Sequence, residues 1–203
     1  MYLPYMMTPY PPYRFEAFKP PPHDIQIQRI NKMNQFLVSA CAIELEEKVI
    51  FTGGAGNSRA VKVYNNEGMI KNETLPSFKQ GRKDHGCGYF INSDNIMVLI
   101  VAGGYWQHQD EDDTLVSTEK LVIGEESWKA VGNLPTAMSS MRGISYNNKI
   151  IMIGGKYQLT YNRFTCYNSV ISYDTTSDQW THVGNTTQKR CDHGASIVSS
   201  IVM

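Results

Sequence analysis

From residue 36 onward, hydrophobic residues occur in short runs of β-branched and aromatic side chains separated by Gly, Asn, Asp and Pro. Such runs, bounded by turn-forming residues, are typical of β-strands. No apolar spacing of three to four residues persists for two helical turns, so the pattern does not favour amphipathic helices. We predict an all-β fold, with strands at residues 36–43, 48–54, 60–65, 87–92, 95–104, 118–123, 127–131, 143–148, 149–155, 169–174, 179–183 and 194–203.

The first 34 residues have a different composition. They are rich in Pro and Tyr and include three consecutive prolines, Pro20 to Pro22. Consecutive prolines favour extended, polyproline-like backbone over a packed element. We predict a flexible leader over residues 1–34, followed by a folded region over residues 35–203. The alternative is that this segment is a proline-rich ligand for an aromatic-lined groove.

Several unlike features recur with one period in the folded region. Paired glycines follow an apolar strand three times, and their first members, at 53, 103 and 154, lie 50 and 51 residues apart. Two tryptophans, each followed by Val-Gly-Asn, lie 52 residues apart, at 128 and 180. An aromatic residue recurs in the third strand of a unit. The recurring residues are Gly53, Gly54, Gly103, Gly104, Gly154, Gly155, Tyr64, Tyr173, Trp128 and Trp180.

The start of each unit also has a pattern. Arg-x-x-His-Gly begins at Arg82 and again at Arg190. The third unit reads Ser-Ser-Met-Arg-Gly over residues 139–143, so aligning the final glycines places Arg142 where the other units have histidine. These features mark offset copies of one supersecondary unit, and fixed periods of this length are typical of repeat architectures.

The residues above resemble the kelch repeat family, in which a unit of roughly 50 residues has a double glycine after its second strand, an aromatic in its third and a Trp in its fourth. The resemblance covers residues 36–203. It implies β-propeller blades built as four-stranded antiparallel meanders, at about 36–80, 81–135 and 136–188, with the first strand of a further blade at 189–203. The glycines would allow close approach of neighbouring backbones, and the rings would fill the core.

Three blades and one extra strand are fewer than the four to eight that close a propeller. We therefore expect a partial or open propeller, whose uncovered blade edges would expose apolar surface and unpaired strand groups. The preferred interpretation is that the sequence is a fragment of a longer protein. The alternative is self-association through the open edges, or a partner that covers them.

Candidate binding residues lie where loops and strand starts should share one face. Long loops are predicted at 105–113 and 156–164, both with aromatic residues, and recognition residues concentrate in such loops. Arginines near the starts of innermost strands could hold an acidic peptide. The predicted ligand-binding residues are Arg82, Arg142, Arg190, Tyr105, Trp106, Tyr157, Tyr161 and Arg163. In the alternative, the arginines bond carbonyls or stack on loops and have structural roles.

Charge and cysteine content narrow the function classes. Nineteen basic and nineteen acidic side chains cancel, so no net field draws the chain to nucleic acid or to a membrane surface. No apolar run approaches the length of a membrane span. Four widely spaced cysteines suggest reduced thiols, and the N-terminus lacks the pattern of a secretory signal. We expect a cytoplasmic protein, in which the sequons at Asn72 and Asn185 would stay unused.

No metal site or cofactor is expected from the sequence. The acidic segment 110–113 lacks the ligand spacing of a calcium loop, and His85 with Cys87, like Cys191 with His193, belongs to a repeat opening and not to a tetrahedral zinc set. A nucleophile with its base, a phosphate-binding glycine loop and paired acids are all missing. We therefore expect a protein that is not an enzyme.

Together these features predict a protein–protein interaction module that presents a loop-lined propeller face to a peptide or protein. The family resemblance suggests a substrate-recognition part of a ubiquitin ligase adaptor or a cytoskeletal scaffold. One alternative is an extracellular, glycosylated kelch module acting in adhesion. Another is an enzyme like the kelch-type copper oxidases, although the Tyr, Cys and His constellation of that site is not evident here.

Overall fold

The computed structural model describes residues 38–45, 47–55, 59–65, 68–69, 75–108, 111–160 and 163–196, and in these ranges it contains strands and turns but no helix. The all-β prediction is therefore confirmed. Within the same ranges, no helix has the length and hydrophobicity that a membrane crossing requires. The predicted leader, residues 1–34, lies outside the described residues. Of the predicted last unit, residues 189–196 are described and contain no strand.

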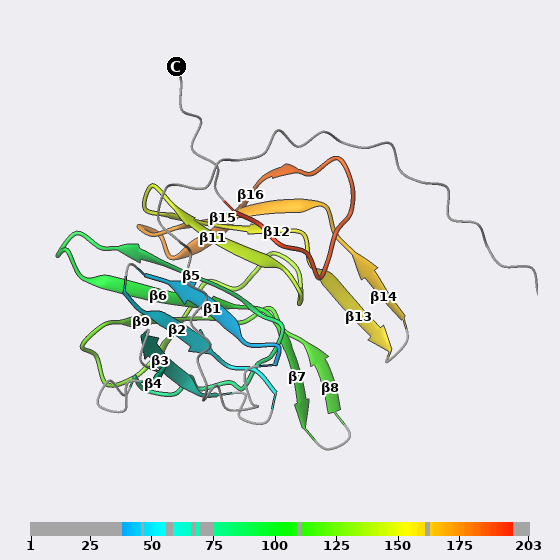
Figure 1. Cartoon of the computed structure of the whole chain (residues 1–203). Helices are drawn as coiled ribbons and strands as arrows, with labels where there is room; N and C mark the ends of the chain where they lie inside the picture. Colours follow the sequence, from blue (N-terminus) through cyan, green and yellow to red (C-terminus); the bar gives the residue numbers. More distant parts are fainter. Residues whose placement is uncertain are drawn as a thin grey trace, which may run out of the picture.

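Most strands belong to three four-stranded antiparallel sheets (Figure 1). The first sheet contains β1 (Cys41–Glu44), β2 (Val49–Thr52), β3 (Val61–Asn65) and β4 (Gly68–Met69). The second contains β5 (Gly86–Ile91), β6 (Met97–Ala102), β9 (Thr118–Val122) and β10 (Lys129–Val131). The third contains β11 (Arg142–Tyr146), β12 (Lys149–Ile153), β15 (Ser169–Asp174) and β16 (Gln179–Asn185). Each sheet is a simple meander, because its strands lie side by side in the order in which they occur along the chain.

Two hairpins are inserted between the second and third strands of the second and third sheets. They consist of β7 (Tyr105–His108) with β8 (Glu111–Thr114), and of β13 (Lys156–Thr160) with β14 (Arg163–Cys166). Both project from the same end of the sheets (Figure 1). These segments were expected to be loops, and the structure corrects this: each segment continues as a paired ribbon, which holds its side chains in fixed register.

The three sheets lie one after another, with an apolar core in each of the two spaces between them. Strand β5 contacts both β1 and β11, so the first strands of the sheets are neighbours. Strand β6 serves both cores: Val98 and Ile100 point to the third sheet, whereas Leu99 and Val101 point to the first. Because both faces of β6 are buried, its sequence is a continuous apolar run and does not alternate.

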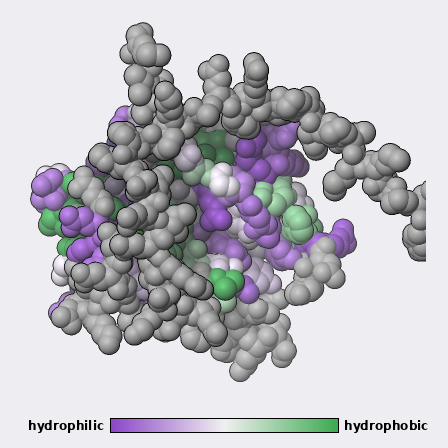
Figure 2. All heavy atoms as spheres, in the orientation of Figure 1, coloured by the Kyte–Doolittle hydropathy of each residue, from purple (hydrophilic) through white to green (hydrophobic). Residues whose placement is uncertain are grey.

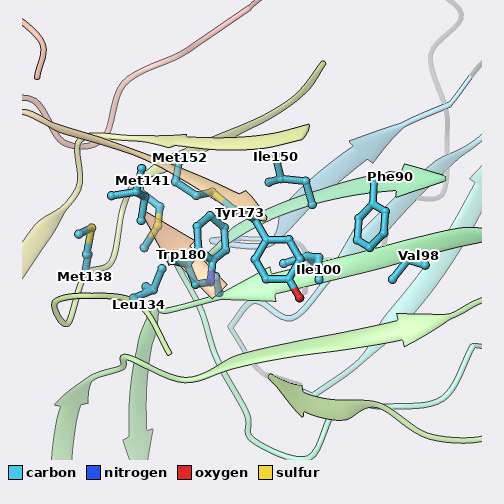
Figure 3. Close-up of a cluster of buried hydrophobic side chains, with 12 residues drawn as sticks. Phe90, Val98, Ile100, Leu134, Met138, Met141, Ile150, Met152, Tyr173 and Trp180 are labelled. Atoms are coloured by element: carbon cyan, nitrogen blue, oxygen red, sulfur yellow. The ribbon is translucent and has the colours of Figure 1, made fainter. Parts of the chain in front are cut away.

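The recurring aromatic residues lie in these cores. Tyr173 and Trp180 pack against each other between the second and third sheets, with ring centroids 5.0 Å apart (Figure 3). Trp128 is fully buried against Phe78 between the first two sheets. The indole N–H of Trp128 donates to the Pro76 carbonyl at 2.7 Å. Burial of these large rings supplies much of the apolar area that drives folding, and the buried indole has the partner it needs.

The three glycine pairs adopt the same backbone conformation. The first glycines have φ of 62°, 59° and 62°, and the second have φ of 102°, 99° and 109°. A Cβ atom on Gly103 would lie 2.3 Å from the Met138 carbonyl oxygen. The amide of each second glycine donates to the backbone that opens the next unit, at the carbonyls of Arg82, Met138 and Arg190. Only glycine combines this conformation with such a close approach.

A chain of hydrogen bonds also links the openings of successive units. The amide of Asp84 donates to Ser39, that of Ser140 to Asp84 and that of Asp192 to Ser140, at 2.9, 2.6 and 3.2 Å. All four residues have positive φ. This equivalence places Met141 in the position that His85 and His193 occupy. The predicted alignment of Arg142 with the histidines is therefore wrong. It matched Gly143 with Gly86 and Gly194, whereas the hydrogen bonds match Arg142 with these two glycines.

All four cysteines are paired. Cys41 and Cys87 join β1 to β5, across the first two sheets, and Cys166 and Cys191 join the end of β14 to the segment after β16. The expectation of reduced thiols is wrong, because each pair brings together cysteines from different repeat units or from a hairpin and the next opening. No short-range spacing in the sequence marks such pairs.

Removing the disulfides should reveal their unequal contributions to stability. Cys41→Ala with Cys87→Ala should lower the free energy of unfolding by about 2–4 kcal/mol, because the bond closes a separation of 46 residues and lies in the core. Cys166→Ala with Cys191→Ala should cost less, since its separation is 25 residues and it lies nearer the surface. Urea unfolding of the two double variants measures this order. Free thiols that react with an alkylating agent in the folded wild-type protein would contradict the pairing.

Candidate functional site

The two hairpins are anchored to the openings of their units and to each other. Lys83 and Tyr105 exchange a pair of backbone hydrogen bonds at 2.9 and 2.7 Å, and Ser139 and Lys156 do the same at 2.8 and 2.7 Å. The amide of Gln158 donates to the Thr114 hydroxyl at 3.2 Å, which joins β13 to β8. The two hairpins are therefore held side by side and fixed to the openings of their units.

The β13–β14 hairpin exposes large apolar side chains. Tyr157, Leu159 and Phe164 are 36%, 55% and 52% exposed. In the strand register Phe164 is opposite Gln158, so Phe164 and Tyr157 lie on opposite faces of the ribbon. Figure 2 shows apolar surface among hydrophilic surface in the region where Figure 1 places β14. Exposed apolar groups on both faces of a projecting element make it a candidate interaction site.

Cationic side chains lie beside two of the rings of this surface. The Lys156 ammonium group is 5.2 Å from the centre of the Phe164 ring, and that of Lys83 is 5.1 Å from the centre of Tyr105. Lys156 also forms an ion pair with Asp192 at 3.0 Å. Cation–π contacts at this distance favour a defined ring orientation, so these rings are presented in an ordered way although they face solvent.

The remaining predicted binding residues have different environments. Arg163 is exposed on β14, whereas Tyr105 and Trp106 are half-buried in β7. Tyr161 lies outside the described residues. Arg142 and Arg190 are exposed, and each guanidinium Nε donates to a backbone carbonyl, of His193 at 2.6 Å and of Gln188 at 3.4 Å respectively.

Arg82 does not lie on this surface. Its side chain is fully buried, and its guanidinium group donates to the Gly103 carbonyl, to Ser117 and to the Glu119 carboxylate at 2.9 Å. The Glu119 carboxylate also accepts from two backbone amides, of Lys79 and Gln80. Burial lowers the pKa of Arg82, against the opposing effect of Glu119. The structure corrects the expectation that Arg82 projects to the open face: it ties the start of the second unit to the end of that unit's hairpin segment.

His85 is a second buried polar residue of the unit opening. Its Nε2 lies 2.8 Å from the Thr52 hydroxyl, which is also 3.3 Å from the Cys41 carbonyl. Burial, with a further contribution from the Arg82 charge, lowers the pKa of His85 to about 3. The imidazole is therefore neutral at physiological pH.

The described residues enclose cavities between the sheets. One, of about 430 Å³, is lined by the first strands β1, β5 and β11 and by Ala195 and Ser196. The other, of about 810 Å³, lies between the first and second sheets, where Leu45, Ile50, Val63 and Leu75 make it largely apolar. Among the described residues, no histidine lines either cavity. In the described part of the chain, no three His, Cys, Asp or Glu side chains gather closely enough to hold a metal ion.

The buried ion pair should contribute far more to stability than an exposed one. Glu119→Ala leaves the Arg82 charge buried without its partner, so we expect a loss of about 3–5 kcal/mol in the free energy of unfolding. Glu125→Ala is the matched control, because Glu125 pairs with Lys129 at the surface and such pairs contribute less than about 1 kcal/mol. Chemical denaturation measures both. Equal effects of the two variants would contradict a structural role for Arg82.

The neutral state of His85 should make the fold sensitive to acid. The pKa of His85 is about 3 in the folded chain and 6.5 as its ordinary value, so below pH 6.5 the unfolded state binds the extra proton. Stability should fall by about 1.4 kcal/mol for each pH unit from 6.5 toward 3. His85→Met, which copies Met141 at the equivalent position, should remove the part of this dependence that His85 causes and so make the pH slope shallower. Parallel pH slopes of the wild type and the variant in thermal unfolding would show that His85 is not its source.

Comparisons with known proteins bear on the fold alone. No protein-family model matches the chain, and no curated protein matches it. Among solved structures, one described as "Structure of YjhT" is similar, with a TM-score of 0.57 and 17% sequence identity. The match covers 75% of this chain and 52% of the other, so the chain spans about half the length of that protein. At this identity the similarity concerns the arrangement of the strands.

Proposed function

We propose that the chain is part of a kelch-type β-propeller that binds another protein or peptide through the β13–β14 hairpin and the adjoining β7–β8 hairpin. Three sequential meanders, glycine pairs with one shared conformation and neighbouring first strands support the propeller. In this proposal each sheet is a blade, and the cavity between β1, β5 and β11 lies near the propeller axis. The remaining blades belong to a longer protein, or a second copy supplies them.

The observation that carries the binding proposal is the exposure of Tyr157, Leu159 and Phe164 on a ribbon that projects from the sheets. Apolar side chains at these positions contribute little to the fold, while a partner would bury them and gain about 25 cal/mol for each Å² of apolar area. Arg142, Arg163 and Arg190 are exposed cations. A peptide with apolar side chains and carboxylates fits this combination.

The compartment in which the module acts has two candidates. The cytoplasmic location expected from the sequence stays a prediction, and so do the roles as a ligase adaptor or a cytoskeletal scaffold. The two disulfides favour the second candidate, an extracellular adhesion-type module, because disulfides form and persist in oxidising compartments. In both compartments we propose a binding protein without a cofactor, and not an enzyme.

The binding surface can be tested with two matched substitutions. Phe164→Asp places a charge on the hairpin, and Tyr146→Asp places one at the opposite end of the third sheet, on the last residue of β11. Both residues are 52% exposed. Proximity labelling in the native cells, followed by quantitative mass spectrometry, should show a partner whose labelling falls at least about tenfold with Phe164→Asp, since an interface hot spot is worth about 2 kcal/mol. Tyr146→Asp should leave that labelling unchanged.

The controls separate binding from folding. Both variants should keep the wild-type thermal unfolding midpoint, because neither residue lies in a core cluster. If every labelled protein responds equally to the two variants, or none responds to Phe164→Asp, the β13–β14 hairpin is not the binding surface.

A further inference from the structure

We propose that Asn185 is an N-glycosylation site of the folded protein, which carries an oligosaccharide at the end of β16. This inference does not rest on the proposed binding function, since the modification is detected without any ligand. It rests on the sequon Asn185-Thr186-Thr187, on its place in the fold and on the two disulfides.

The sequon has the geometry of an attachment point. Asn185 is the last residue of β16, the edge strand of the third sheet, and its side chain is exposed. Its amide oxygen lies 3.1 Å from Nε2 of the exposed His182. Thr187, which supplies the hydroxyl that the sequon requires, is exposed as well. The sequon does not specify the residue at position 186. The hydroxyl of Thr186 donates to the backbone carbonyls of Gln188 and Asn168.

The second sheet shows that this position stays open beside a following sheet. There the same Val-Gly-Asn tripeptide ends at Asn133. Gly132 packs against the third sheet, with its amide donating to the Asp178 carbonyl at 2.9 Å, yet Asn133 is exposed. By equivalence, Asn185 would stay exposed if a further sheet packed on the third one. Asn133 is followed by Leu-Pro and is no sequon, so it serves as an internal control.

The disulfides supply an independent argument about the compartment. N-linked glycans are added along the secretory route, where the environment also allows disulfides to form. The Cys166–Cys191 bond brackets Asn185 in the chain, so the bond and the glycan would form on the same segment. A chain folded in the reducing cytosol would have neither of them.

The transfer uses a lipid-linked oligosaccharide pyrophosphate as donor. A bond forms between the first sugar carbon and Nδ2 of Asn185, the bond from that carbon to the phosphate oxygen breaks, and the amide gives up one proton. The lipid pyrophosphate leaves. A glycan at this position would shield the unpaired edge of β16, and edge strands need such protection against pairing with other chains.

The test measures occupancy in protein isolated from its own cells. Peptide N-glycosidase in heavy-oxygen water converts a glycosylated Asn to labelled Asp, which mass spectrometry detects in the tryptic peptide of residues 164–189. We expect label at Asn185 and none at Asn133. The same peptide, before reduction, should be linked to the peptide that contains Cys191, which reports the disulfide in the same sample.

Three variants, expressed in those cells, decide whether the sequon is responsible. Thr187→Ala should abolish the label at Asn185, whereas Thr187→Ser, which restores the hydroxyl, should retain it. Thr186→Ala should retain the label too, although it removes the bonds to Asn168 and Gln188. Unlabelled Asn185 in the wild type, with or without the disulfide, overturns the proposal, and so does label that persists in Thr187→Ala.

Discussion

The structure depends on the close backbone approach between each glycine pair and the opening of the next unit. The second glycine donates to a carbonyl there, and a side chain on the first would collide with the same backbone. The contact sets the distance between successive sheets, and with it the width of the two apolar cores. The aromatic rings fit a space that the glycines define, which explains why the two kinds of residue recur with one period.

Much of the fold was predictable because its causes are local or periodic. Short β-branched runs indicate eleven of the sixteen strands found in the described residues, and the repeat marks the glycines and rings. The hairpins β7–β8 and β13–β14 are predicted as loops, because the kelch resemblance places a loop after the glycine pair that ends each second strand. Their pairing arises from anchoring at Lys83 and Ser139, which only the folded chain brings into position. The cysteine pairs are not predictable for a related reason: each partner lies far along the chain, 46 and 25 residues away.

The candidate site was less predictable, since identical motifs have different surroundings. Arg82 and Arg190 open equivalent units, yet Arg82 is buried by Ser117 and Glu119 while Arg190 is exposed. The sequence of the motif alone does not show which residues pack against its arginine. Phe164 and Leu159, which carry most of the exposed apolar surface of the hairpin, were not singled out. The signal that could have found them is the placement of large apolar residues in a segment that has no core to join.

The double burial of β6 has a consequence for how the chain finds its pairing. In a strand with one polar face, a slip by one residue turns apolar side chains to water and is rejected on that ground. In β6 a slip would merely exchange the two cores, since Val98, Leu99, Ile100 and Val101 are all apolar. Hydrophobicity therefore cannot select the register of this strand. The glycine pair that follows β6 determines the register instead, because its backbone contact can form in one alignment only. The register of β6 therefore depends on the residues at its end and not on the side chains of its two faces.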